Sequence, residues 1–131
     1  GFLIDLEGVK MSKSLGNSIE AEQVVKQSGA DILRLWVAMS DYRGEIRVSN
    51  EILARAAEAY RKFRNTLRYL VSNLYDFDPA TDAVPLGELE EVDRYILARY
   101  ADLATRVLTS YENYDYGTIF QSLNAFATGD V

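Results

Sequence analysis

The sequence predicts a mainly α fold: a short strand and a loop at the N-terminus, two short helices, and then part of an antiparallel α-helical bundle. Three stretches place apolar residues at steps of three or four, which is the period of an amphipathic helix: 49–74, 88–111 and 116–127. Both prolines of the chain fall between the first two stretches, in 76–87, which is typical of a connector. Two long helices joined in this way and followed by a third predict a bundle.

The first 48 residues predict shorter elements. The apolar run Phe2 to Asp5 and the turn signal at Leu6-Glu7-Gly8 predict a hairpin-like strand and loop. Helical spacing over 20–27 predicts a helix that Gly29 would end. A second short helix over 30–39 is apolar nearly all round, so we expect it to be well buried, with Trp36 in the core. Residues 40–47 predict a loop with a short strand.

Ser49 is a suitable N-cap for the first long helix. The apolar stripes of the three predicted bundle helices are Ile52, Ala56, Tyr60, Phe63, Leu67, Leu70 and Leu74, then Leu89, Val92, Ile96, Tyr100, Leu103, Val107 and Tyr111, and then Ile119, Phe120, Leu123, Phe126 and Ala127. We expect these stripes to pack in the bundle core.

The composition excludes several kinds of chemistry. The chain has no histidine and no cysteine, so it has no imidazole base, no His-containing triad, no disulfide and no thiolate or imidazole metal ligand. We expect no metal site. No apolar run is long enough to cross a membrane, and we expect a cytoplasmic protein without a membrane partner.

The net charge of −6 argues against a dedicated nucleic-acid binder, but the charges are unevenly distributed. Every charged residue between Asp76 and Asp93 is acidic, whereas the stretch from Arg55 to Tyr69 has one acid, Glu58, among five cations. A local basic face therefore survives on the first long helix.

The run Lys10-Met11-Ser12-Lys13-Ser14 places two ammonium groups and two hydroxyls within five residues. Such a loop can present cations and hydrogen-bond donors to phosphate oxygens. The alternative is a solvated polar loop with two surface lysines, which a five-residue pattern alone does not exclude.

This run resembles the second signature of the class I aminoacyl-tRNA synthetases, and the resemblance extends along the chain. GFLIDLEGVKMSKSLGN, GADILRLWVAMSDYRGEIRVSNEIL, AYRKFRNTLRYLVSNLYDFDP, DRYILARY and YENYDYGTIFQSLNAF are similar, in this order, to segments of the isoleucyl-tRNA synthetase family. The valyl and leucyl relatives share the signature and remain an alternative. So does a different class, an autonomous helical module that binds RNA or protein.

The resemblance implies ATP-dependent activation of isoleucine, with Mg²⁺, and transfer of the acyl group to tRNA(Ile). Lys13 would be the catalytic lysine that pairs with the phosphates, Lys10 a secondary catalytic contact, and Ser12 and Ser14 further ATP contacts. Met11 would pack against the core. Preorganised donors of this kind contribute about 10² to 10³ in rate.

The resemblance also implies two domains. Residues 1–48 would be the end of the catalytic core with the signature loop and a stem-contact segment, and residues 49–131 an incomplete helical anticodon-binding domain. The candidate tRNA contacts are Arg61, Arg64 and Arg68 on one flank of the first long helix, with Tyr42 and Arg43 in the loop before it. A solvated face is the alternative reading of the arginines.

Without histidine the family's first signature, HIGH, is absent from these residues. We therefore expect a fragment, with the isoleucine and adenine pocket lying upstream. On this hypothesis the 131 residues alone neither activate isoleucine nor hold ATP or another cofactor tightly.

Overall fold

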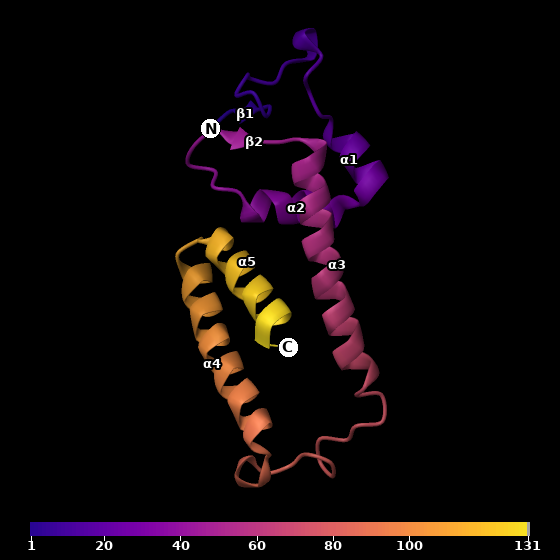
Figure 1. Ribbon diagram of the computed structural model, residues 1–131, viewed down its shortest axis with the longest axis vertical. Helices are drawn as coiled ribbons and strands as arrows, with labels where there is room; N and C mark the ends of the chain where they lie inside the picture. The colour runs from indigo at the N-terminus through magenta and orange to yellow at the C-terminus, as the bar shows by residue number, and fades with distance from the viewer. Residues whose placement is uncertain (131) are drawn as a thin grey trace. The chain divides into compact units, whose positions relative to one another are not determined.

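The computed structural model describes residues 1–130 and is mainly helical, as predicted (Figure 1). Its elements are β1 (Leu3–Ile4), a 3₁₀ turn η1 (Lys13–Leu15), α1 (Ala21–Ser28), α2 (Ala30–Met39), β2 (Ile46–Arg47), α3 (Asn50–Ser72), a 3₁₀ turn η2 (Leu86–Glu88), α4 (Glu91–Glu112), α5 (Tyr116–Ala125) and a π turn η3 (Phe126–Asp130). The chain forms two compact units, Gly1–Arg61 and Lys62–Val131. The division falls within α3.

The N-terminal strand takes part in two pairings. β1 pairs in parallel with β2, with Leu3 opposite Ile46, and Ile4 also forms an antiparallel bridge to Lys10. The hairpin-like entry and the short strand in 40–47 are therefore confirmed. The Met11 N–H donates to the Leu3 carbonyl at 3.0 Å, so the signature loop leaves directly from the edge of this small sheet.

The core of the first unit lies among α1, α2, β2 and the first turns of α3. Its buried members are Val24, Ile32, Trp36, Val48, Leu53 and Ala56. The buried position of Trp36 confirms the prediction for that residue. Leu53 and Ala56 belong to this core although they follow the expected domain boundary at 48/49, so α3 is fastened to the N-terminal unit by its first two turns.

The prediction that the helix over 30–39 is buried nearly all round is wrong for one face. Ile32 and Trp36 are buried, but the Val37 side chain is 56% exposed. The reason is geometric, because α2 contacts α1 and α3 through one side only, and a short helix cannot cover its outer side by itself.

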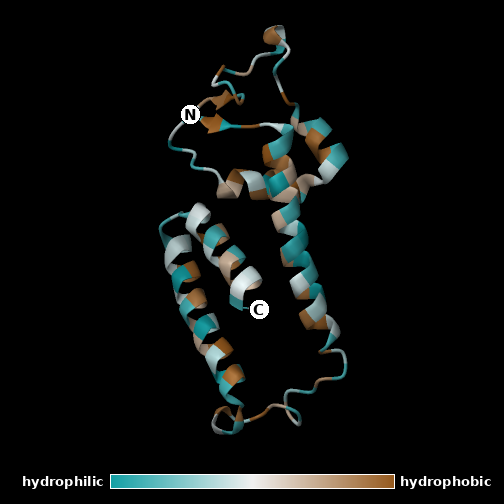
Figure 2. Cartoon of the chain, in the orientation of Figure 1, coloured by the Kyte–Doolittle hydropathy of each residue, from teal (hydrophilic) through white to brown (hydrophobic). Residues whose placement is uncertain are grey.

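Side-chain oxygens cap the N-terminal ends of α3 and α5. The Ser49 hydroxyl accepts the N–H of Ile52 at 3.1 Å, which confirms the predicted N-cap of α3. Asp115 caps α5 in the same way, by accepting the Thr118 N–H at 3.2 Å. Figure 2 shows apolar and polar residues alternating along α3 and α4, as amphipathic helices require.

α4 ends in a Schellman motif. The Asp115 N–H donates to the Ser110 carbonyl at 2.8 Å, and the Tyr114 N–H donates to the Tyr111 carbonyl at 3.1 Å. Tyr114 occupies the left-handed position of this motif, with φ of 55°. The turn sends α5 back along α4, so these two helices form an antiparallel pair (Figure 1).

Burial in the second unit is sparse. Within residues 62–130, Ser110 and Ile119 are the buried residues. The Phe63 and Phe120 rings pack edge to face with centroids 6.1 Å apart. Leu67, Leu70, Tyr100 and Tyr111 are largely exposed, so the expectation that each stripe packs fully in a bundle core is wrong for these positions. Among the described residues α4 packs mainly against α5 and η3, so stripe positions beyond this contact have no helix to cover them.

Candidate functional site

The signature loop is held at both ends by the first unit. At its start, Lys10 is bridged to Ile4 of β1. Inside it, Met11 packs against the core cluster, as expected. After it, Gly16 ends η1 with φ of 68°, a left-handed conformation that glycine adopts without strain. Lys10, Lys13 and Ser14 are therefore exposed on an anchored base, whereas Ser12 is partly buried.

The two lysines of the loop point to different partners. The Lys13 side chain is 87% exposed, and its Nζ lies 3.3 Å from the Glu20 carboxylate. The Lys10 Nζ lies 4.1 Å from the centroid of the Phe2 ring, within cation–π range. The two ammonium groups therefore each have a contact of their own, which sequence reasoning did not identify.

The two serines are brought together. Ser12 Oγ and Ser14 Oγ are 2.8 Å apart, and Ser12 Oγ also accepts the Leu15 N–H at 3.3 Å. Ser12 thus caps the 3₁₀ turn that carries Lys13. The Ser12 hydroxyl therefore has two partners within the loop, and the Ser14 side chain is exposed.

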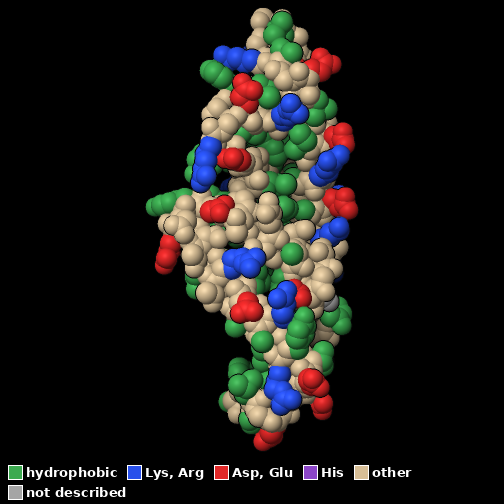
Figure 3. Space-filling model, turned by 60° about the vertical axis from the view of Figure 1, so that its left-hand side comes forward, with side chains coloured by type: hydrophobic (Ala, Val, Ile, Leu, Met, Phe, Trp, Pro, Cys, Tyr) green, Lys and Arg blue, Asp and Glu red, His purple; other side chains and the backbone are tan. Residues whose placement is uncertain are grey.

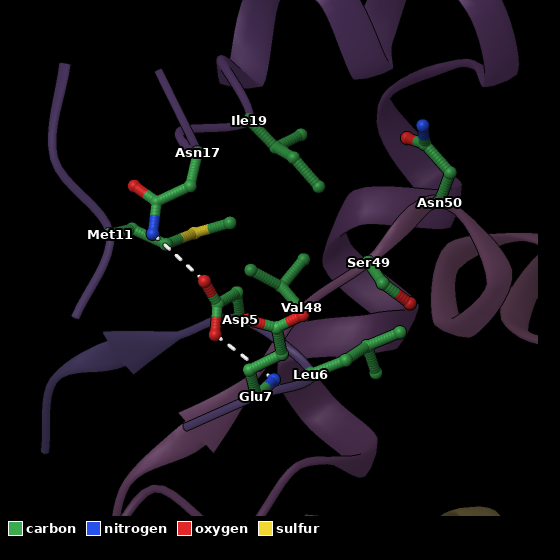
Figure 4. Close-up of a pocket in the computed structure, with 9 residues that line it drawn as sticks. All are labelled: Asp5, Leu6, Glu7, Met11, Asn17, Ile19, Val48, Ser49 and Asn50. Atoms are coloured by element: carbon green, nitrogen blue, oxygen red, sulfur yellow. Dashed lines mark hydrogen bonds between the residues drawn. The ribbon is translucent and has the colours of Figure 1, made fainter. Parts of the chain in front are cut away.

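Asp5 and Asn17 are the residues that sequence reasoning missed. The Asn17 Nδ2 donates to Asp5 Oδ2 at 2.9 Å, and Asn17 Oδ1 accepts the Ser12 N–H at 2.9 Å. Asp5 Oδ1 accepts the N–H groups of Glu7 and Val9 at 3.0 and 2.8 Å. Figure 4 shows the Asn17 amide directed at the Asp5 carboxylate.

These hydrogen bonds act on the charge of Asp5. The bond from Asn17, followed by those from the backbone, holds the pKa of the Asp5 carboxyl below its usual value of 3.8. Asp5 is therefore ionised at neutral pH. The signal available in the sequence was an acidic residue that ends an apolar run just before a turn, which is common and did not single it out.

An open depression of about 350 Å³ lies beside this pair (Figure 4). It is lined by Asp5, Leu6, Glu7, Met11, Asn17, Ile19, Val48, Ser49 and Asn50. Within residues 1–130 no group of three or more aspartates or glutamates is arranged to hold a metal ion.

The candidate tRNA contacts are exposed. Arg61, Arg64 and Arg68 follow one another along α3 at steps of three and four, and none forms an ion pair with another residue of the described chain. Tyr42 and Arg43 lie in the loop between α2 and β2, where the Arg43 N–H donates to the Asp41 carboxylate at 3.1 Å.

The wider surface is of mixed charge. Figure 3 shows lysine and arginine side chains interleaved with acidic ones on the face drawn, rather than one continuous basic area. No helix of the described residues is long and apolar enough to cross a membrane.

Comparison with known proteins shows the family of the chain. Residues 1–49 match the family described as tRNA synthetases class I (I, L, M and V). The chain is 52% identical over 128 residues to the isoleucine--tRNA ligase of Geobacillus kaustophilus and 52% identical over 126 residues to that of Staphylococcus aureus. These alignments cover 98% and 96% of the chain, but the chain spans 14% of the length of each relative.

One solved structure shares the fold, with a TM-score of 0.73 and 24% identity over 97% of this chain and 16% of that one. It is a leucyl-tRNA synthetase (LeuRS) of Agrobacterium radiobacter K84 in a ternary complex with tRNA and LeuAMS. The family match covers the signature loop, and the similarity to the curated relatives continues through the helices that follow it. The chain therefore belongs to the class I tRNA synthetases, as a segment that matches isoleucine--tRNA ligases over nearly its whole length.

Proposed function

We propose that this chain is the part of an isoleucine--tRNA ligase that contributes the phosphate-contacting loop and the first helices that contact tRNA. The observation that carries the proposal is 52% identity over 98% of the chain to a relative of that name. The leucyl alternative has less support, because the likeness to the leucyl enzyme is 24% identity and extends to the fold alone.

The proposed reaction joins the carboxylate of isoleucine to the α-phosphate of ATP, with release of pyrophosphate, and the acyl group then passes to the tRNA. In this reaction Lys13 pairs with the phosphate oxygens that gain negative charge as pyrophosphate leaves. Its long exposed side chain on a short turn supports this role, because the ammonium can leave Glu20 for a more highly charged partner.

Lys10, Ser12 and Ser14 are proposed as accompanying ATP contacts. The 2.8 Å contact between the two hydroxyls places them side by side, so that a phosphate oxygen could replace one partner of that hydrogen bond. Lys10 lies at the start of the same loop and would add a second positive charge. Mg²⁺ would accompany ATP as part of the substrate.

A direct test uses the complete ligase that contains this segment. We expect isoleucine-dependent exchange of pyrophosphate into ATP, and we expect Lys13→Ala to lower its rate by about 10² to 10³. Lys26→Ala is the matched control, because Lys26 is an exposed lysine on α1 outside the loop. A complete protein that exchanges with leucine or valine instead would reject the isoleucyl assignment, and a fully active Lys13→Ala variant would reject the role of Lys13.

We further propose that residues 49–131 belong to the helical anticodon-binding domain and that Arg61, Arg64 and Arg68 contact phosphates of tRNA(Ile). Exposure of all three on one helix supports the proposal, and the net charge of −6 weighs against a larger basic surface. Tyr42 and Arg43 are proposed as contacts from the loop before β2. A cytoplasmic location is part of the same proposal.

The arginine contacts are tested by tRNA binding to the complete ligase at several salt concentrations. Neutralising all three arginines to Gln should weaken binding and reduce the salt slope by about one for each phosphate that the protein no longer neutralises. Arg55→Gln is the control, because Arg55 is already paired with Glu51 on the same helix. An unchanged affinity and slope would leave these arginines as a solvated face.

A further inference from the structure

The Asn17 side chain joins the two ends of the signature loop. Its Oδ1 accepts the N–H of Ser12 at 2.9 Å, and its Nδ2 lies 3.5 Å from the carbonyl oxygen of Lys10. Ser12 and Asn17 are five positions apart along the chain. The loop that carries Lys13 is thus closed by a side chain rather than by a strand pairing.

The other half of this contact ties the loop to the hairpin. Asn17 Nδ2 donates to Asp5 Oδ2 at 2.9 Å, and Asp5 Oδ1 is held by the N–H groups of Glu7 and Val9. Because Asp5 follows β1 directly, the carboxylate has a fixed position relative to the small sheet. We call Asp5 and Asn17 the clasp.

The chemistry of the clasp is specific to an amide opposite a carboxylate. The Asn17 amide supplies an acceptor for Ser12 and a donor for Asp5 at the same time. An aspartate at position 17 would offer acceptors only and would repel Asp5, and an alanine would offer neither. Asn17→Ala therefore tests loss of the hydrogen bonds, whereas Asn17→Asp replaces the hydrogen bond to Asp5 with charge repulsion.

We propose that Asn17 and Asp5 are positioning residues that preorder the loop, so that Lys13 reaches the phosphates of ATP without first having to fix the backbone of residues 12–16. This rests on the proposed function of the loop. Neither clasp residue touches the reacting atoms. Their effect is on the fraction of loop conformations from which Lys13 can reach the leaving phosphates, and therefore on the rate of adenylate formation rather than on isoleucine binding.

The test is steady-state pyrophosphate exchange in the complete ligase. Asn17→Ala and Asp5→Ala should each lower kcat about tenfold, the scale of removing a hydrogen bond to a charged group, with KM for isoleucine unchanged. Asn17→Asp should lower kcat further. The double variant should lose less activity than the product of the two single losses, because both substitutions break the hydrogen bond between Asn17 and Asp5. Asn65→Ala is the control, since Asn65 is an exposed asparagine on α3.

Hydrogen exchange at the Ser12 amide gives a readout that does not depend on activity. It should quicken in Asn17→Ala and stay unchanged in Asn65→Ala. The proposal would be overturned if Asn17→Ala kept the wild-type kcat, or if its hydrogen exchange at Ser12 were unaltered. It would also be overturned if KM for isoleucine rose by the same factor as kcat fell. If Lys13→Ala keeps full activity, the proposed function of the loop fails, whereas the Ser12 exchange still reports on the clasp.

Discussion

The Lys13 ammonium lies 3.3 Å from the carboxylate of Glu20, the residue that precedes α1 as its N-cap. Both side chains are largely exposed, so the attraction between them is weak and screened by salt. In the proposed enzyme this contact is the resting position of Lys13, and the negative charge of ATP competes with Glu20 for the same cation.

Glu20→Gln should therefore have a small effect in the favourable direction. Removing a weak competitor should lower KM for ATP by about twofold, with little change in kcat, because exposed pairs are worth little. The measurement is pyrophosphate exchange against ATP concentration at low salt. Glu22→Gln, at an exposed acid in the first turn of α1, is the control. A marked fall in activity for Glu20→Gln would show that Glu20 acts in the reaction rather than at rest.

Trp36→Ala should destabilise the first unit severely. Trp36 is 7% exposed and packs in the cluster with Ile32 and Ala56, so truncation leaves a large cavity, and the expected loss in free energy of unfolding is about 3–5 kcal/mol. Val37→Ala, at the exposed neighbour on α2, should change it by less than about 0.5 kcal/mol. Denaturant unfolding of both variants checks this. Equal effects at the two positions would contradict the described orientation of α2.

Tyr114→Gly should stabilise the second unit slightly. Tyr114 holds the left-handed position that glycine usually fills, which costs a non-glycine residue about 1–2 kcal/mol. Glycine removes this backbone strain but is also more flexible in the unfolded chain, which offsets part of the stabilisation. The free energy of unfolding should therefore rise by about 0.5–1 kcal/mol. Thermal unfolding measures it. Leu108→Gly, within α4 and exposed, should instead lose about 1 kcal/mol. A loss for Tyr114→Gly would mean that its ring contributes more than its backbone costs.

The clasp should be visible in the titration of Asp5. The folded pKa lies below 3.8, so the hydrogen bonds contribute stability that is fully present above the unfolded value and is lost as the pH falls through the folded pKa. In Asn17→Ala the Asp5 midpoint should rise towards 3.8, because the largest contribution to its depression is removed. Carboxyl chemical shifts followed from pH 6 to about pH 2 report the midpoint. An unshifted midpoint in Asn17→Ala would contradict the hydrogen bond.

Local sequence patterns were sufficient to predict most of the helices. The helix predicted over 30–39 is α2 with the same bounds, and the predicted cap Ser49 begins α3, because caps and helical periods depend on residues only a few positions apart. The pairing of strands that are distant in the sequence could not be predicted in this way. β1 meets β2 across more than 40 residues, and two strand residues at each site are too few to show an alternation.

By itself the sequence determined the mainly helical class and the position of the signature loop. It also determined the resemblance to aminoacyl-tRNA synthetases, which implies that the loop contacts phosphates. Only the tertiary structure decided what the loop rests on: Glu20 beside Lys13, Phe2 beneath Lys10, and Asn17 between Ser12 and Asp5. The physical reason is that each of these contacts joins residues separated by irregular backbone, which has no fixed period. Their distance depends on how the hairpin, the loop and α1 fold together, and no spacing along the chain records it.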